Sequence, residues 1–162
     1  MHTLNNNDFS NRKAVIRVDF NVPLDENLQV TDSTRILAAK ESIDYILNHG
    51  GSCVLISHLG RPKGKDAAFS LYHIVNKVSE ILRIPVLFCD DCVGPKAETA
   101  TAQLKPGEVI LMENLRFYPE EAAGDFNFAL GLSKLGDFYV NDAFGTAHRA
   151  HSSTTIMAQF FD

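Results

Sequence analysis

The chain alternates short apolar runs with stretches in which apolar residues recur at helical spacing. The apolar runs are short and continuous, which is typical of strands that a parallel sheet buries on both faces. A further short extended piece is expected over 28–30, after a turn that contains Pro23 and Asp25. The predicted strands cover residues 14–18, 53–56, 85–88, 109–112 and 138–140.

Helices are predicted between successive strands. Asp32 or Ser33 can cap the first of them, and Gly50 with Gly51 follows its end. Ser70 is the expected cap of the second helix. The predicted helices cover 33–48, 71–81, 94–104 and 125–135, with the opening turns of another over 154–161.

This alternation predicts an α/β fold in which a parallel sheet carries helices on both faces. The sequence contains no linker, internal repeat or low-complexity segment, and 162 residues suffice for one hydrophobic core. We therefore expect residues 1–162 to form a single three-layer α/β domain.

Composition narrows the class of protein. The chain is 45% apolar and 22% charged, which is ordinary for a globular domain, and its net charge of −5 argues against general nucleic-acid binding. No apolar run approaches the ~18 to 20 residues that span a bilayer, and the polar start lacks the pattern of a signal peptide. We expect a cytoplasmic protein that binds neither nucleic acid nor membrane.

The candidate site lies in the loops that follow the predicted strands, because ligands of open α/β sheets bind beyond the carboxyl ends of the strands. Three of these loops carry an arginine, namely Arg61, Arg116 and Arg149, and Arg35 at the start of the first helix can join them. Guanidinium groups bind phosphate or carboxylate through two-point hydrogen bonds, and helix N-termini add positive potential. A site for a small, multiply anionic ligand is therefore predicted.

Residues 60–65 resemble a phosphate-binding P-loop. The spacing is one residue short, and Asp66 stands where Ser or Thr should ligate magnesium. We therefore expect no nucleotide site at this loop.

A cysteine pair and a histidine pair suggest other chemistry. Cys89 and Cys92 form a CxxC pattern, which occurs in redox and zinc proteins, but there is no second such pair and the two residues between them are acidic. His148 and His151 are spaced for one metal ion, with no evident third ligand. We expect ordinary cysteines and no metal site.

Five segments resemble the phosphoglycerate kinase family and occur in the family's order. They cover the chain after its leader, and the length of the last one makes chance negligible. The segments are RVDFNVP at 17–23, VTDSTRI at 30–36, SHLGRP at 57–62, ENLRF at 113–117 and NDAFGTAHRAHSS at 141–153.

The resemblance implies a two-domain glycolytic enzyme that moves a phosphoryl group between 1,3-bisphosphoglycerate and ADP, giving 3-phosphoglycerate and ATP. One domain holds the glycerate ligand, and the other holds the magnesium nucleotide. The chain resembles the amino-terminal glycerate domain, truncated at residue 162, so the nucleotide domain with Mg-ADP or Mg-ATP is expected to be absent. We expect the fragment to bind no cofactor, to be inactive alone and to self-associate, whereas the full-length enzyme is expected to be a monomer.

The resemblance also implies roles for individual residues. Asp19 and Asn21 would bind the carboxylate-and-hydroxyl end, while His58 and the arginines of the last three loops would hold the 3-phosphate end. Arg35 would be the catalytic group, because it would offset the charge of the transferring group. His58 is expected to donate a hydrogen bond, since a carboxylate acceptor needs no general base. The implied substrate-binding residues are Asp19, Phe20, Asn21, Arg35, His58, Leu59, Gly60, Arg61, Arg116 and Arg149.

Two other functions stay open at this point. One is a stand-alone module that binds 3-phosphoglycerate for regulation without turnover. The other is a thiol-redox or metal protein built around Cys89 and Cys92, against which the full set of family-like loops argues.

Overall fold

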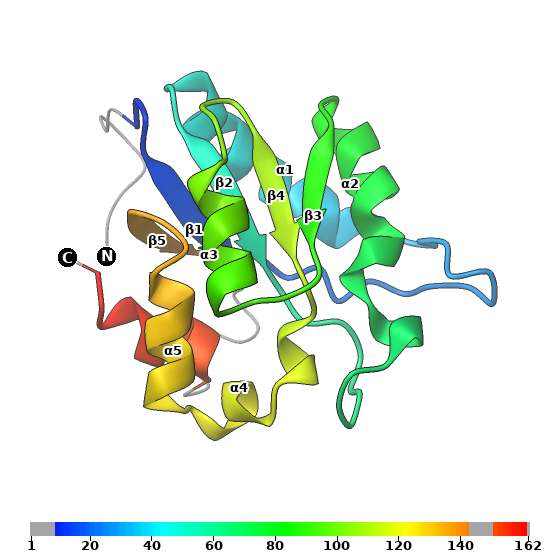
Figure 1. Cartoon of the computed structure of the whole chain (residues 1–162). Coiled ribbons are helices and arrows are strands. Elements are labelled where there is room, and N and C mark those ends of the chain that lie inside the picture. Colours follow the sequence, from blue (N-terminus) through cyan, green and yellow to red (C-terminus); the bar gives the residue numbers. More distant parts are fainter. Residues whose placement is uncertain (1–8, 143–150, 162) are drawn as a thin grey trace.

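The computed structural model describes residues 9–142 and 151–161, which form an α/β structure around one sheet (Figure 1). The sheet has five strands in the order β3-β4-β2-β1-β5, and every neighbouring pair is parallel. All five predicted strands are confirmed to within one residue at either end. The strands are β1 (Lys13–Arg17), β2 (Ser52–Ile56), β3 (Val86–Cys89), β4 (Val109–Met112) and β5 (Phe138–Asn141).

Helices of several kinds connect the strands. The four predicted inter-strand helices are present, and the second begins as the 3₁₀ helix η2, which leads directly into α2. Five residues that sequence periodicity did not identify form the short helix α4. The elements are α1 (Thr34–Asn48), η1 (Ala67–Phe69), η2 (Leu71–Ile74), α2 (Val75–Leu82), α3 (Pro95–Ala102), η3 (Leu115–Phe117), α4 (Pro119–Ala123), α5 (Phe126–Ser133) and the π-helix η5 (Ser152–Ile156).

The starts of α1 and η2 can be compared with the caps that the sequence predicted. The Ser70 hydroxyl accepts a hydrogen bond from the Tyr72 amide at the start of η2, as expected of a cap. At the start of α1 the Ser33 side chain makes no capping bond, and the carboxylate of Asp32 accepts from the backbone N–H and hydroxyl of Thr34 instead. Asp32 rather than Ser33 therefore stabilises the first turn.

The short strand expected over 28–30 does not form. Val30 instead makes one isolated antiparallel bridge with Leu24. Between these residues the carboxylate of Asp25 accepts from the backbone N–H groups of Asn27 and Gln29. Hydrogen bonds within this turn replace those of a strand ladder.

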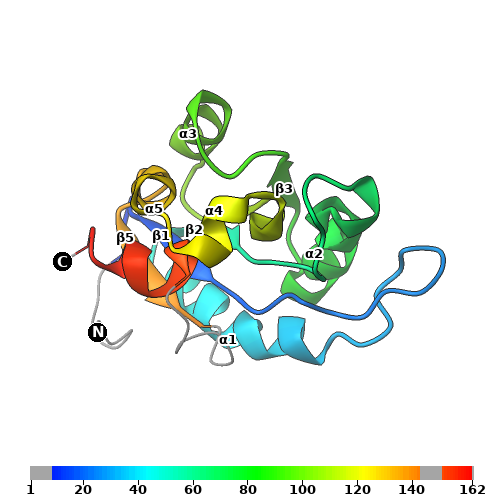
Figure 2. The same ribbon diagram turned by 90° about the horizontal axis from the view of Figure 1, so that it is seen from below.

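Side chains of alternate strand residues point to opposite faces of the sheet, and each face is covered by its own helices (Figure 2). On one face Ile16 and Leu55 pack with the buried residues of α1 and α2. On the other face Val15 and Val54 pack with α3, α5 and Met157. The predicted three-layer arrangement is therefore confirmed.

The topology locates the crevice in which ligands of such folds bind. The chain leaves β2 for helices on one face, whereas it leaves the adjacent β4 for helices on the other. Loops that part in this way open a crevice at the carboxyl ends of the two strands. The loop after β2 carries His58 and Arg61, and the loop after β4 carries Arg116.

The surface of the described residues adds two observations. No described helix is both long enough and apolar enough to cross a membrane. Large apolar side chains are exposed at separate places on α1, η2, β3 and α5. Whether the chain self-associates through them is not tested by the structure, so self-association stays a prediction. These side chains are Leu37, Tyr72, Leu87 and Phe126.

Candidate functional site

Asn114 joins the loops that follow β2 and β4. Its Oδ1 accepts from the backbone N–H of Leu59 at 3.2 Å and of Arg116 at 2.9 Å. Its Nδ2 donates to the carbonyl oxygens of Leu59 and Phe69, each at 2.8 Å. The side chain is fully buried, so these four bonds fix where Arg116 and the loop after β2 begin.

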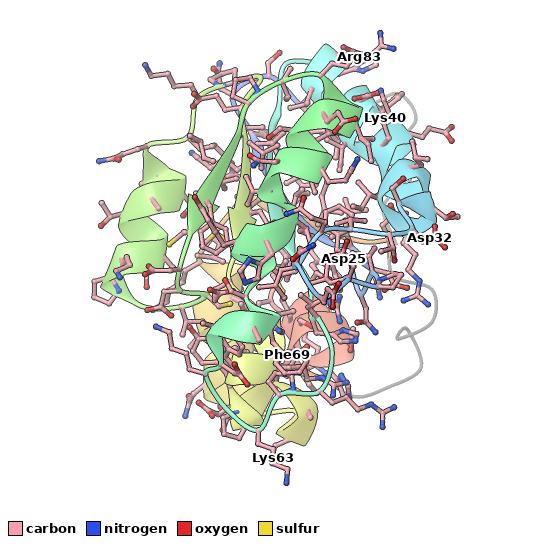
Figure 3. All side chains as sticks on the ribbon, turned by 90° about the vertical axis from the view of Figure 1, so that its right-hand side faces the viewer. Asp25, Asp32, Lys40, Lys63, Phe69 and Arg83 are labelled. Carbon is pink, nitrogen blue, oxygen red and sulfur yellow. The ribbon has the colours of Figure 1, made fainter. Side chains whose placement is uncertain are left out.

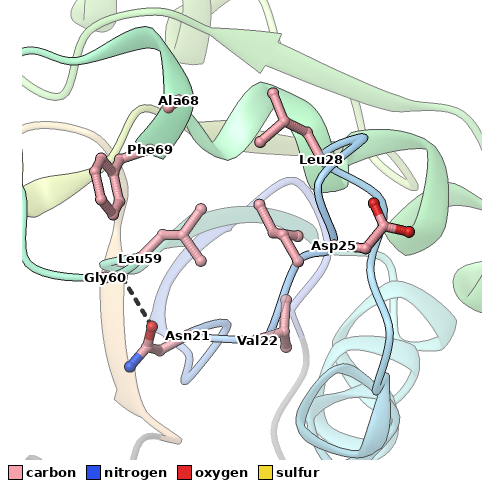
Figure 4. A pocket seen from close by; sticks show the side chains of 9 residues that line it. Asn21, Val22, Asp25, Leu28, Leu59, Gly60, Ala68 and Phe69 are labelled. Carbon is pink, nitrogen blue, oxygen red and sulfur yellow. Dashed lines mark hydrogen bonds between the residues drawn. The ribbon is translucent and has the colours of Figure 1, made fainter.

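A second set of bonds ties the loop after β1 to its neighbours. The Oδ1 of Asn21 accepts from the backbone N–H of Gly60 at 2.8 Å (Figure 4). Arg35 donates from Nη1 to the Asn21 carbonyl at 2.7 Å and to Asp19 Oδ1 at 3.3 Å. The structure thus brings Asp19, Asn21, Arg35 and Gly60 together, as the sequence predicts.

Gly60 occupies a position that requires glycine. Its φ is +62°, in the left-handed region that residues with a side chain rarely adopt. An added Cβ would lie 2.5 Å from the ring of Phe69. Glycine therefore allows Phe69 to pack closely against the residue whose N–H donates to Asn21.

Arg17 is a charged residue inside this site that the sequence did not single out. Its side chain is 1% exposed and donates from Nε to the Ser153 hydroxyl at 2.9 Å, from Nη1 to the Val18 carbonyl and from Nη2 to His58 Nδ1 at 2.9 Å. The Ser153 hydroxyl in turn donates to the buried carboxylate of Glu121. This chain of contacts links β1, α4, η5 and the loop after β2.

Arg17 and Glu121 each stabilise the charged form of the other. Burial lowers the pKa of Arg17, and the negative charge of Glu121 opposes that shift. Burial likewise raises the pKa of Glu121, which the hydrogen bonds from Ser153 and the charge of Arg17 oppose. The charge of each buried side chain therefore offsets part of the desolvation cost of the other.

Arg116 has an unsatisfied donor. Its Nε is buried and makes no hydrogen bond within the part of the chain that the structure describes. The group lies close enough to Arg17 and Glu121 to influence the pKa of both. A buried N–H without an acceptor is costly, so this donor is suited to an anionic oxygen supplied by a ligand.

The other predicted ligand residues differ in how accessible they are. Arg61 is exposed, and His58 is mostly buried against Arg17. The side chains of Phe20 and Leu59 belong to the hydrophobic core, so a ligand contact through them would have to use the backbone. Arg149 lies outside the described residues.

A cavity of about 320 Å³ lies beside the Asn21–Gly60 hydrogen bond (Figure 4). Its lining is mainly apolar, including Leu28, Leu59 and Phe69, and Asp25 is the only charged residue among the described residues that line it. A carboxylate and apolar walls disfavour an anion. An anionic ligand is thus better placed on the arginine side of Asn21.

The P-loop interpretation of residues 60–65 finds no support in the described geometry. Asp66 follows this segment, and its carboxylate accepts from the Ala68 N–H at the start of η1. A negative charge at the start of this turn opposes a phosphate there.

The cysteines have the environment of structural residues. Cys89 and Cys92 are 5% and 0% exposed, and the Cys92 thiol donates to the Glu113 carbonyl. Burial raises the pKa of Cys53, Cys89 and Cys92. A raised thiol pKa opposes thiolate formation and therefore redox chemistry. His148, half of the histidine pair, lies outside the described residues.

We expect the three thiols of the native chain to react slowly with iodoacetamide at pH 8, because burial both shields them and keeps them protonated. All three should react rapidly in denaturant, as followed by mass spectrometry over time. Fast labelling of Cys89 or Cys92 in native protein would contradict their assignment as structural residues.

Comparison with known proteins agrees with the geometry. The family model described as phosphoglycerate kinase matches residues 4–162. The phosphoglycerate kinase of Porphyromonas gingivalis is 46% identical over 183 residues, an alignment with 99% of this chain and 44% of that protein. The chloroplastic phosphoglycerate kinase 2 of Arabidopsis thaliana is 50% identical over 157 residues, with 97% of this chain and 33% of that protein.

A solved structure has the same fold. The phosphoglycerate kinase of Pyrococcus horikoshii superposes with a TM-score of 0.90 at 32% identity, covering 99% of this chain and 41% of that one. The chain thus spans between 33% and 44% of the length of these three relatives. Because the family model covers nearly all of its residues, the chain belongs to the phosphoglycerate kinase family.

Proposed function

We propose that this chain supplies the glycerate-substrate site of a phosphoglycerate kinase, binding 3-phosphoglycerate and 1,3-bisphosphoglycerate at the carboxyl edge of the sheet. The observation that carries the proposal is the buried Nε of Arg116, which has no acceptor among the described residues. It lies in the loop that Asn114 holds against the loop after β2, where the topology opens a crevice.

The proposed roles follow the positions of the donors. His58, Arg61 and Arg116 come from the two loops that part at the crevice, and they would hold the 3-phosphate. Asp19 and Asn21 lie on the neighbouring loop, beside Arg35, and would bind the carboxylate-and-hydroxyl end. Arg149 stays a predicted ligand.

Arg35 is proposed to be catalytic. Its side chain is 51% exposed while one nitrogen is anchored on Asn21, so the remaining donors can reach a ligand. In transfer between an acyl phosphate and ADP, charge on the moving phosphoryl group is what a guanidinium can stabilise. The magnesium nucleotide is proposed to bind elsewhere in the complete enzyme, and we expect no turnover from this chain alone. Location in the cytoplasm also stays a prediction.

Calorimetry tests the binding site. We expect the purified chain to bind 3-phosphoglycerate saturably and ATP not at all. Arg116→Ala should weaken binding by roughly 10- to 100-fold, the usual cost of losing hydrogen bonds to a charged group. Arg83→Gly is the matched control, because Arg83 lies at the far end of the molecule from Lys63 in the loop after β2 (Figure 3).

Glycine fits the control position, since the φ of Arg83 is +62°. The control should bind like the wild type. Equal weakening in both variants would show that net charge, and not the site, governs binding. No binding by a well-folded wild-type chain would refute a site that works independently.

A further inference from the structure

We propose that Arg17 is a positioning residue that holds the ring of His58 as its Nε2–H tautomer, so that His58 offers a neutral hydrogen-bond donor to the phosphate of the glycerate ligand. The inference deepens the proposed function and rests on it. It concerns a residue that would touch no substrate and would act through another side chain.

The contact itself determines the tautomer. Nη2 of Arg17 lies 2.9 Å from His58 Nδ1, and a guanidinium has only donors. Nδ1 must therefore be the acceptor and carry no proton. A neutral imidazole has one N–H, which then resides on Nε2, while a doubly protonated ring would place N–H against N–H.

The other contacts of Arg17 prevent it from turning away. Its Nε donates to Ser153 Oγ, and its Nη1 donates to the carbonyl of Val18. The Ser153 hydroxyl is itself held by Glu121. Because all these groups are buried, rotating the guanidinium would remove the hydrogen bonds that it donates to three buried acceptors.

The arrangement suits a phosphate ligand. Nearby arginines already supply positive charge, so a histidine adds most by donating in a fixed direction. A fixed Nε2–H tautomer avoids the loss of binding free energy that follows when an unprotonated ring nitrogen faces a phosphate oxygen. In many metal sites an outer group also orients a histidine through its far nitrogen, but there it accepts the ring N–H, whereas Arg17 donates to the ring.

Nitrogen NMR of the imidazole ring tests the tautomer directly. In long-range proton–nitrogen spectra at neutral pH, the His58 signals, assigned by their loss in His58→Gln, should show an unprotonated Nδ1 and a protonated Nε2. The pattern should persist when the chain is saturated with 3-phosphoglycerate. A protonated Nδ1 in the wild type would overturn the inference, whatever the affinity.

Variants test the positioning role. Arg17→Lys cannot serve Ser153, Val18 and His58 together, so the ring should populate both tautomers and 3-phosphoglycerate should bind about tenfold more weakly. Unchanged tautomer and affinity in a folded Arg17→Lys chain would contradict the role.

A second pair of variants leaves Arg17 in place. In His58→Gln the amide can donate near the position of Nε2, whereas in His58→Asn it reaches only the position of Nδ1. Binding should therefore be retained better with Gln than with Asn, and the reverse order would overturn the inference. Failure of the wild type to bind 3-phosphoglycerate would refute the proposed function instead, and the ring spectrum would still report the tautomer.

Discussion

Replacing Asn114 by alanine should destabilise the chain by about 3–5 kcal/mol and abolish measurable binding of 3-phosphoglycerate. The side chain makes four hydrogen bonds in a fully buried place. Alanine would leave the N–H groups of Leu59 and Arg116 and the carbonyls of Leu59 and Phe69 without these partners. Each buried polar group left unpaired costs about 1–3 kcal/mol, with partial relief from relaxation.

Urea unfolding followed by circular dichroism measures this loss as a lower midpoint at an unchanged slope. Asn76→Ala is the control, because Asn76 is exposed on α2 and alanine favours helix, so its stability should change by about 0.5 kcal/mol or less. If Asn114→Ala were as stable as this control, the loops after β2 and β4 would not depend on Asn114 for their junction.

Replacing Glu121 by alanine should cost about 3–5 kcal/mol of stability, because it leaves the buried guanidinium of Arg17 without the carboxylate that opposes its desolvation. The change also removes the acceptor of the Ser153 N–H, at 2.8 Å, and of the Ser153 hydroxyl. The π-helix η5 should therefore lose both hydrogen bonds that it makes to the Glu121 side chain, while the bond from Ser152 to the Glu120 carbonyl remains.

Glu120→Ala provides the matched control on the same helix. Glu120 contributes its backbone carbonyl, which accepts from Ser152 Oγ, and that contact survives the substitution. We expect a loss of about 0.5 kcal/mol from the weaker interaction with the helix dipole. Thermal unfolding of both variants should separate them clearly, and near-equal midpoints would mean that Arg17 does not need Glu121.

Local pattern was sufficient to predict the framework. Continuous apolar runs located the strands because a parallel sheet with two covered faces needs apolar residues throughout. The helix α4 was missed because five residues are too short to show periodicity, although Pro119 and Gly124 are ordinary start and stop residues. The π-helical turn of η5 also has no sequence pattern that distinguishes it from an ordinary helix.

Part of the candidate site could be predicted from the sequence. Loops that follow parallel strands meet at one edge, so Asn21, Arg35 and Gly60 could be placed together from their order alone. Arg17 could not be assigned to the site from the sequence, because arginine is seldom fully buried and its partner Ser153 lies 136 residues away. Asn114 resembles any loop asparagine until the fold brings Leu59 and Phe69 to it.

The central claim is that this chain binds 3-phosphoglycerate at the carboxyl edge of its sheet, and backbone amide NMR during a titration tests it most directly. The account predicts saturable shifts at the N–H groups of Asn21, Gly60 and Arg116, with little change at Arg83 and Gly107 at the opposite edge. Shifts centred on Arg83 or Gly107, or none at any of these amides at saturating ligand, would contradict it.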